Sequence, residues 1–391
     1  MGKIKVLHIA SFNGNIGDNA NHNGFRKRLI KTLNRDCSFT NLEMREFYKS
    51  WNYRDFNSYE FIRLCNEHDL VVIGGGNFFE LQWDYSVTGT TVNISLKTLD
   101  AILTPILFHG VGCDVSKGAS ESAIEKFKIF LERITNDDNI LVSVRNDGSY
   151  ETIRDLYGDL FEGKVIKVPD GAFFMESKKF YFPEISVSLK SIGINVVSDM
   201  KNIRFSENVE NGIRYDDFNK SFGEVLNKFL EEYENYQLIL FPHIYSDLLA
   251  IYDLMENIND KYRRTRIVIA PCLTGQGADE YIFGLYKECE FIMGMRFHTN
   301  VCSIAQNIPT IALNSYKKIR DLYNELGLES RVVDVNRIGF EESLRVLIKN
   351  TINDRENIVR DYSEVNQKIL SQSSEFYNRV YIWYQKQVRV K

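Results

Sequence analysis

Short runs of apolar and β-branched residues alternate with segments of helical periodicity along most of the chain. Predicted strands in the first half occupy residues 4–10, 69–73, 105–111, 140–144 and 164–168. Predicted helices in the same half cover residues 19–33, 121–135 and 150–157. In the second of these helices, Ile124, Phe127 and Leu131 recur at helical spacing. Strands that alternate with helices are typical of βαβ units and of a mainly parallel sheet.

The alternation stops over residues 176–189, which contain Pro183 and are predicted to form a linker. It then resumes, with predicted strands at residues 191–196, 237–241, 266–270, 291–294, 309–313 and 331–335. We therefore predict an α/β protein with two Rossmann-like, doubly wound domains that face a cleft. They cover residues 1–180 and 190–350. Helices over residues 351–391 follow, and packing back across both domains is one arrangement open to them.

The composition of the chain argues against several classes of protein. The 391 residues include 48 Lys and Arg against 53 Asp and Glu, a net charge of −5 that argues against a general nucleic-acid binder. The six cysteines form no Cys-x-x-Cys pair, so we expect neither a zinc site nor a disulfide framework. No run approaches 18 apolar residues, and the first apolar run is too short for a signal peptide. We expect a cytoplasmic protein.

Two glycine-containing turns follow predicted strands. Asn15, Gly17 and Asp18 come after the first strand, before a helix whose N-terminus can bind an anion. The alternative is that Asp18 or Asn19 only caps that helix. The second turn is Gly74-Gly75-Gly76-Asn77, where glycines allow a ligand to approach the backbone. A purely structural turn is the alternative here.

Aromatic residues make up 13% of the chain, and several gather near the second glycine turn. Trp83 and Tyr85 follow it, and Tyr48, Trp51 and Tyr53 precede it. These side chains are candidates for a platform that binds sugar rings. Packing in the core explains them equally well.

Cations follow other predicted strands. Arg145 ends one strand, where its planar guanidinium suits a carboxylate or phosphate, although an ion pair with a neighbouring carboxylate is the alternative. Asp170 follows the next strand. Arg296 and His298 follow the strand at 291–294, and in an extended segment both would point to one side. Lys318 follows the next strand. His243 and Asp247 are weaker candidates.

In order and spacing, these short motifs resemble those of the polysaccharide pyruvyl transferase family over residues 4–328. The resemblance rests on Asn15-Ile-Gly-Asp-Asn19, Ile73-Gly-Gly-Gly-Asn77, Gly110-Val-Gly112, Ser143-Val-Arg145, Pro169-Asp170, Gly294-Met-Arg-Phe-His298, Ile308-Pro309 and Tyr316-Lys-Lys318. It implies a GT-B-like fold. It also implies transfer of pyruvate from phosphoenolpyruvate onto two hydroxyls of a sugar in a polysaccharide or its precursor, which forms a cyclic ketal.

The resemblance also implies roles for the candidate residues. The donor, phosphoenolpyruvate, would meet Arg145, Arg296, His298 and Lys318, mainly on the C-terminal domain. His298 would be the general acid, since histidine titrates near neutral pH, and Asp170 or Asp18 would accept a hydroxyl proton. The acceptor and its loops would involve Asn15, Gly17, Asp18, Gly75, Gly76, Asn77 and Trp83 on the N-terminal domain.

The chemistry implied by the resemblance needs no metal and no cofactor, and no nucleic-acid partner is expected. The acceptor would be a sugar or a lipid-linked oligosaccharide, and a lipid-linked acceptor would bring the protein to the inner membrane surface. The aromatic Tyr381, Trp383 and Tyr384 near the C-terminus could then contact lipid, although packing against the domains is the alternative. Two other functions remain open: a GT-B glycosyltransferase that uses a nucleotide sugar, and a non-catalytic sugar- or anion-binding protein.

Overall fold

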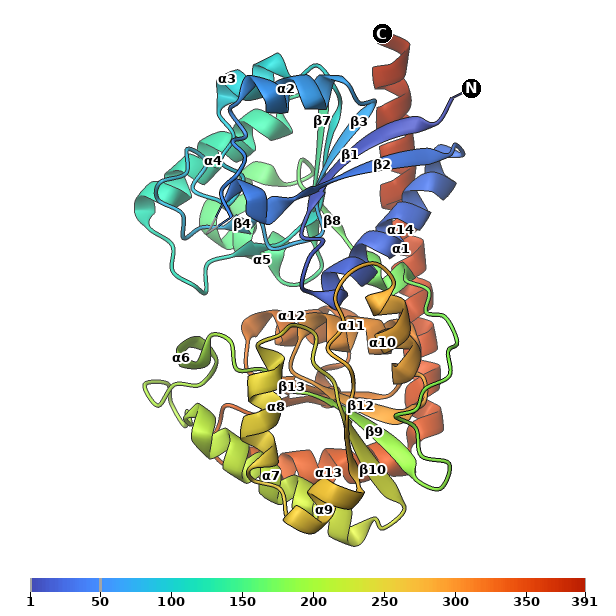
Figure 1. Ribbon diagram of the computed structural model, residues 1–391. Helices are drawn as coiled ribbons and strands as arrows, with labels where there is room; N and C mark the ends of the chain where they lie inside the picture. Colours follow the sequence, from blue (N-terminus) through green and yellow to red (C-terminus); the bar gives the residue numbers. More distant parts are fainter. Residues whose placement is uncertain (1, 49–50, 391) are drawn as a thin grey trace. The chain divides into compact units, whose positions relative to one another are not determined.

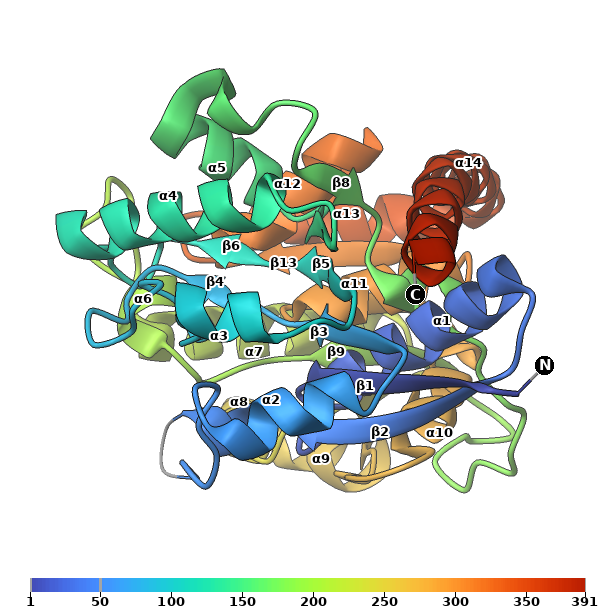
Figure 2. The same cartoon turned by 90° about the horizontal axis from the view of Figure 1, so that it is seen from above.

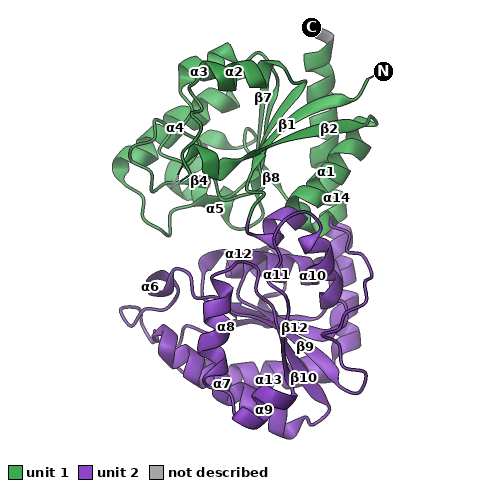
Figure 3. Ribbon diagram, in the orientation of Figure 1, with its two compact units in different colours: residues 1–13, 21–174, 369–391 green, residues 14–20, 175–368 purple. Residues whose placement is uncertain are grey.

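The computed structural model describes residues 2–48 and 51–390. These residues form two compact units (Figure 3). Unit 1 comprises the chain up to Asn13, residues Asn21–Phe174 and the chain from Ile369 onward. Unit 2 comprises Gly14–Ala20 and Met175–Lys368. Residues 176–189, the predicted linker, contain no helix or strand.

Unit 1 is built on a parallel sheet with the strand order β2-β1-β3-β5-β7-β8 (Figure 1). Its strands are β1 (Ile4–Ala10), β2 (Cys37–Glu43), β3 (Leu70–Gly74), β5 (Ile106–Val111), β7 (Ile140–Arg145) and β8 (Ile166–Val168). The short strands β4 (Phe79–Glu80) and β6 (Cys113–Asp114) pair separately. Helices of this unit are α2 (Tyr59–Asn66), α3 (Leu96–Ala101), α4 (Glu121–Thr135), α5 (Ser149–Tyr157) and the 3₁₀ helices η1 (Met44–Phe47), η2 (Gly158–Phe161) and η3 (Gly171–Phe174).

Both faces of this sheet are buried, as a doubly wound fold requires. In β1, Leu7 and Ile9 join a core that includes side chains from α2, α3, α4 and α5. Ile4 and Val6 join a second core formed with α1 (Ile16–Leu33) and the last part of α14 (Arg355–Val390). Figures 1 and 2 both show α1 and α14 side by side.

Unit 2 is built on a second parallel sheet, with the order β11-β10-β9-β12-β13-β14. Its strands are β9 (Lys190–Asn195), β10 (Tyr236–Leu240), β11 (Ile267–Ile269), β12 (Cys289–Gly294), β13 (Thr310–Asn314) and β14 (Val332–Asp334). Its helices are α6 (Lys201–Arg204), α7 (Tyr215–Glu232), α8 (Asp247–Met255), α9 (Asp260–Thr265), α10 (Ala278–Tyr286), α11 (Phe297–Ala305), α12 (Lys317–Leu326), η4 (Glu329–Arg331) and α13 (Phe340–Asn353). Side chains of β9, β10, β12 and β13 share a core with α7, α8 and α13.

Each sheet has one point where the strand order reverses, and ligands of open α/β sheets bind beyond the carboxyl ends of the strands there. In unit 1 the reversal lies between β1 and β3, and in unit 2 it lies between β9 and β12. The expected pair of Rossmann-like units is therefore confirmed, followed by the C-terminal helix α14. No helix among the described residues is both long enough and apolar enough to span a membrane.

Candidate active site

The carboxyl end of β12 carries the arginine and histidine that the sequence analysis singled out. Arg296 is the extended residue that precedes α11, and His298 lies in the first turn of that helix. The prediction that both share one extended segment is wrong, because the helix begins one residue earlier than expected. The backbone N–H of Arg296 donates to Asn195 Oδ1 at 3.0 Å, at the end of β9. Arg296 is therefore fixed at the strand-order reversal of unit 2.

Asp247 holds the guanidinium of Arg296. Nε donates to Asp247 Oδ2 at 2.7 Å and Nη2 donates to Oδ1, a bidentate arrangement. The backbone N–H of His243 donates to the same Asp247 at 2.9 Å and so fixes the carboxylate. Burial opposes the charge of Arg296, but the hydrogen bonds and charge of Asp247 outweigh burial and raise its pKa. The site therefore contains a permanently charged, oriented cation.

A second arginine, Arg204, lies beside this pair. Its Nη1 donates to Ser315 Oγ at 3.3 Å, and its guanidinium lies 5.2 Å from the ring centre of Tyr316. Asp199 is within 3.5 Å of Arg204 Nε and 3.6 Å of Arg296 Nη2. Burial lowers the pKa of Arg204, and the charge of Asp199 partly offsets this effect. Asp199 therefore bridges two arginines that arrive from different elements.

His298 is buried against the first turn of α1. Its Nδ1 lies 3.8 Å from Asp18 Oδ1, which is within ion-pair distance. A Cβ atom at Gly17 would lie 2.4 Å from the Cβ of His298, so this turn can approach only as glycine. Asn15 Oδ1 accepts the N–H of Gly17 at 3.0 Å and caps the helix. The alternative that Asp18 or Asn19 is the cap is therefore wrong.

His243 is a weaker candidate that the structure assigns to packing. Its Nε2 lies 2.8 Å from the hydroxyl of Tyr286 in the interior of unit 2. Burial lowers its pKa well below the usual value, and the charges of Arg296 and His298 lower it further. A neutral His243 therefore supports the site through its backbone hydrogen bond to Asp247, and its buried ring is not placed to deliver protons.

Lys318 lies half-buried in the first turn of α12, directly after β13. The first turns of α11 and α12 both follow carboxyl ends of neighbouring strands. The N-terminus of a helix carries partial positive charge and unpaired N–H groups. Together with Arg296 and Lys318, these helix starts make this edge of the sheet suited to an anion.

Arg145 is the last residue of β7 in unit 1, where β5 separates its strand from β3 at the strand-order reversal, and its surroundings differ from those of Arg296. Nε and Nη2 donate to Asp147 Oδ2 at 3.0 and 2.8 Å, and Nη1 donates to Asp170 Oδ2 at 3.2 Å. Only 5% of the Arg145 side chain is exposed, and neither carboxylate is exposed at all. The ion pair foreseen as the alternative for Arg145 is therefore present in the structure.

Asp170 is held by several donors. Asn21 Nδ2 donates to its Oδ2 at 2.6 Å, and the backbone N–H of Ala172 donates to its Oδ1 at 2.8 Å. Its own backbone N–H donates to Asn146 Oδ1 at 2.9 Å. The carboxylate therefore connects α1, the end of β7 and the segment after β8.

The glycine turn after β3 is explained by close packing. Gly75 has φ +74°, and a Cβ there would lie 2.7 Å from the His22 ring. A Cβ at Gly76 would lie 2.5 Å from the Phe78 ring. Asn77 Nδ2 donates to carboxylates of β4 and β6 at 2.6 and 3.3 Å. Each of these positions has a structural reason that does not involve a ligand.

The aromatic candidates divide into buried and exposed members. Tyr48 is buried, and Trp83 packs partly against the core of unit 1. Tyr53 and Tyr85 are largely exposed, and all four line one hollow of unit 1, whereas Trp51 does not line it. Core packing therefore accounts for Tyr48 and in part for Trp83, and the sugar-platform interpretation of Tyr53 and Tyr85 stays a prediction.

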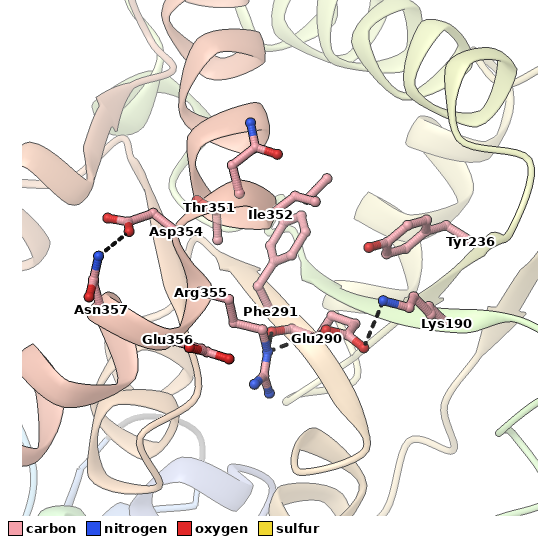
Figure 4. A pocket seen from close by; sticks show the side chains of 11 residues that line it. Lys190, Tyr236, Glu290, Phe291, Thr351, Ile352, Asp354, Arg355, Glu356 and Asn357 are labelled. Atoms are coloured by element: carbon pink, nitrogen blue, oxygen red, sulfur yellow. Dashed lines mark hydrogen bonds and ion pairs between the residues drawn. The ribbon is translucent and has the colours of Figure 1, made fainter.

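Another pocket, of about 390 Å³, opens in unit 2 (Figure 4). Lys190, Tyr236 and Glu290 line it, and they lie at or near the amino ends of β9, β10 and β12. Glu290 lies 3.6 Å from Lys190 Nζ and 3.3 Å from Arg355 Nε. Because this is the edge of the sheet opposite to Arg296, the pocket is not a candidate for the reaction.

Two charged residues of the Arg296 cluster, Asp199 and Arg204, were not predicted from the sequence. Asp199 comes four residues after the end of β9, so the search for charges after strands could have found it. Arg204 lies on the short helix α6, and no local pattern marks it. Among the described residues, no group of three or more His, Cys, Asp or Glu side chains is arranged to bind a metal ion.

Comparison with solved structures shows the fold of the chain. MnaA of S. aureus, solved with UDP, aligns with a TM-score of 0.52 at 12% identity, over 96% of this chain and 97% of that chain. The UDP-GlcNAc 2-epimerase of Methanocaldococcus jannaschii aligns with a TM-score of 0.51 at 14% identity, over 88% and 92%. The predicted GT-B-like fold is thereby confirmed.

Comparison of sequences shows the family. No curated protein sequence matches the chain. The family model of the polysaccharide pyruvyl transferases matches residues 15–316. This match begins at Asn15 and ends at Tyr316, so it includes Arg145, Arg296 and His298. Since it covers most of the chain, the protein belongs to the polysaccharide pyruvyl transferase family.

Proposed function

We propose that this protein transfers pyruvate from phosphoenolpyruvate onto two hydroxyls of a sugar and forms a cyclic ketal. The observation that carries the proposal is the pairing of an oriented arginine, Arg296, with a buried histidine, His298, at the strand-order reversal of unit 2. The family supports a pyruvyl transfer, and this geometry supports an anionic donor.

The donor carries a carboxylate and a phosphate, so its site needs directed cations and N–H groups. Asp247 uses Nε and Nη2 of Arg296, and no acceptor among the described side chains takes Nη1. We propose that Nη1 binds the phosphate, together with Lys318 and the first turns of α11 and α12. Arg145 would have to leave Asp147 or Asp170 to bind the donor, so we assign Arg145 a positioning role.

In the proposed reaction, His298 in its protonated form donates a proton to C3 of the enol. C2 becomes electrophilic, and an oxygen of the sugar attacks it and loses its proton. The bond between C2 and the bridging oxygen then breaks, and phosphate leaves with the electron pair. A second sugar hydroxyl attacks C2 and closes the ketal. The two hydroxyl protons are balanced by the new C–H bond and by the proton that phosphate carries away.

Asp18 is the carboxylate placed to assist His298, at 3.8 Å from its Nδ1. We propose that Asp18 orients the imidazole and helps it to recover its proton after each turnover. Asp170 was the other candidate for the hydroxyl proton. Because its oxygens already accept from Asn21, Ala172 and Arg145, we propose that it holds Arg145 and does not act as a base.

The test is phosphate release from phosphoenolpyruvate in the presence of a panel of disaccharides, with the product identified by mass. We expect release only when an acceptor is present. Removal of a general acid lowers rates by roughly 10²–10⁴-fold, so His298→Ala should lower turnover by about that factor. Asp18→Asn should lower turnover less. A His298→Ala protein with full turnover would overturn the assignment of the acid.

The same protein samples separate the other functions. Thermal stabilisation by UDP-GlcNAc but not by phosphoenolpyruvate would favour a glycosyltransferase. Stabilisation by phosphoenolpyruvate without phosphate release from any acceptor would favour a binding protein. Stabilisation by phosphoenolpyruvate that Arg296→Ala abolishes, together with acceptor-dependent release, would support the proposal.

A further inference from the structure

A hollow of about 740 Å³ lies on unit 1, beside the loops that follow β2 and β4. Its aromatic lining includes Tyr48, Tyr53, Trp83 and Tyr85. Pockets for drug-sized ligands, which are larger than one hexose, measure roughly 300–1,000 Å³. The hollow therefore has room for a ligand of more than one sugar ring.

Two aromatic residues of the hollow are more exposed than aromatic side chains of a protein core. Tyr53 is 80% exposed and Tyr85 is 63% exposed, although both stand next to a well-packed interior. Trp83 supplies the connection, because its ring packs edge-to-face on Tyr48 at 5.7 Å and on Tyr85 at 5.8 Å. The cluster is thus anchored at its buried end by Trp83 and Tyr48 and open to solvent at Tyr53 and Tyr85. Contiguous exposed apolar surface is a feature of ligand-binding grooves and interaction sites.

The loop that carries Tyr85 is held in place before any ligand arrives. The Thr88 hydroxyl lies 3.0 Å from that of Ser86 and 2.9 Å from that of Thr90, and it donates to the Val92 carbonyl at 2.8 Å. Asn93 Oδ1 accepts the N–H of Val87 at 2.9 Å and closes the loop. A preformed surface of this kind loses little conformational entropy on binding.

The two loops that form the hollow are also tied to each other. Asn57 Nδ2 donates to the Asn93 carbonyl at 2.9 Å, and Asn57 Oδ1 accepts the N–H of Ser95 at 2.8 Å. The backbone N–H of Arg54 donates to the carbonyl of Glu46 at 2.9 Å. The backbone segments that carry Tyr53 and Tyr85 are therefore held together by the fold.

The polar part of the lining indicates a neutral, hydroxylated ligand. It contains Asn52, Arg54, Asp55 and Asn93, which offer donors and acceptors but no net charge. Arg54 is moreover paired with Glu46. Such a surface does not favour phosphoenolpyruvate. A pyranose fits it, because the C–H face of the ring is apolar and its rim carries hydroxyls.

We propose that this hollow binds a sugar ring of an oligosaccharide acceptor, with the ring stacked on Tyr53 and Tyr85. The inference takes from the proposed function only that the ligand is a sugar. The bound ring is a positioning element, and the hollow offers no group for the transfer chemistry itself. The proposal predicts that acceptors of two or more rings bind better than monosaccharides.

The test measures binding without phosphoenolpyruvate, by saturation-transfer NMR with lactose, cellobiose, maltose and chitobiose. The variant is the double substitution Tyr53→Ala/Tyr85→Ala, which removes two exposed rings and leaves the anchors Tyr48 and Trp83. The matched control is Tyr59→Ala, because Tyr59 belongs to the same unit, is 74% exposed and does not line the hollow. We expect saturation of ring C–H protons of at least one disaccharide, weakened by about tenfold or more in the double variant and unchanged in the control.

A kinetic readout on the same variants separates this site from the donor site. The double variant should raise KM for the disaccharide acceptor by about the same tenfold and leave kcat and KM for phosphoenolpyruvate unchanged. Absence of saturation transfer for all four disaccharides, or transfer that the double variant retains in full, overturns the inference. If the protein binds a disaccharide here but releases no phosphate, the proposed function is wrong and the proposed sugar site is still supported.

Discussion

Arg145 and Arg296 both lie at the carboxyl end of an interior parallel strand, one in each unit, and have different surroundings. Arg145 ends β7 and Arg296 follows β12, and each is within ion-pair distance of two carboxylates. The carboxylates of Arg145 use Nε, Nη1 and Nη2, and all are buried. Arg296 keeps Nη1 available and has His298 two residues away. A position at a strand end therefore identifies an arginine as a candidate site residue. Whether we assign it a structural or a donor-binding role depends on whether it has an N–H group that no carboxylate uses.

The largest expected effect separates the two arginines by stability. Arg145→Ala leaves two carboxylates buried without their cation, which costs about 3–5 kcal/mol of unfolding free energy. Arg296→Ala should cost less, because only Asp247 of its two carboxylates is fully buried, whereas Asp199 is 30% exposed. Urea unfolding followed by tryptophan fluorescence measures the first effect, since Trp51, Trp83 and Trp383 all belong to unit 1.

Turnover should show the reverse order, with Arg296→Ala the more damaged at a temperature where both variants are folded. The corresponding lysine variants are the controls, since lysine keeps the charge but not the planar fork. If Arg145→Ala had wild-type stability and a raised KM for phosphoenolpyruvate, Arg145 would bind the donor substrate directly. The proposed difference between the two arginines would then be wrong.

Acid should destabilise unit 1 more steeply than unit 2. Burial lowers the pKa of His8 well below the usual value and that of His109 to about 3, both in unit 1, and it lowers the pKa of His243 in unit 2. As pH falls below about 6.5, these histidines take up protons when unfolded but not when folded, so stability is lost. The limiting slopes are about 2.7 kcal/mol per pH unit for unit 1 and about 1.4 for unit 2.

This difference can be measured by urea unfolding at pH 7.5, 6.5 and 5.5. Tryptophan fluorescence reports on unit 1, and hydrogen exchange of peptides from residues 215–255 reports on unit 2. His109→Gln should flatten the slope of unit 1 and leave that of unit 2 unchanged. Equal slopes for the two units in the wild-type protein would contradict the prediction.

The smallest effect concerns the turn that supports His298. Gly17→Ala forces a Cβ to 2.4 Å from the Cβ of His298, and overpacking of this kind costs about 1–3 kcal/mol. We expect turnover to fall as well, because the imidazole must move away from Asp18. Gly2→Ala is the control, since no atom lies within 4 Å of a Cβ there. A Gly17→Ala protein with unchanged thermal midpoint and turnover would show that this contact is dispensable.

Much of the fold was predictable because strands buried on both faces have continuous apolar sequences. Leu70–Gly74 and Ile106–Val111 are examples, and the structure places both in the middle of the unit 1 sheet. Strand β2 was missed because Cys37–Glu43 is largely polar, as an edge strand can be. The start of α1 was placed three residues late, because Gly17 in its first turn hides the helical pattern.

The site was predictable only in part. The rule that ligands bind beyond strand ends identified Arg296, His298 and Arg145 from local sequence. The rule could not show that Gly17 is glycine because of His298, or that Arg145 is enclosed by Asp147 and Asp170. Those relations join segments that are far apart in the chain, and no single-sequence pattern encodes them.

The division of the chain between the two units also affects the order in which they can fold during synthesis. Phe25 and Leu29 of α1 share their core with Phe376 and Tyr377 of α14, which are made long after α1. Unit 1 begins first on the ribosome, yet one face of its sheet is covered only by α1 until α14 emerges. Unit 2 extends to Lys368 and does not include the part of α14 that packs on unit 1. A nascent chain would thus expose the apolar face of α1 longest, and this is where a chaperone would bind to prevent aggregation.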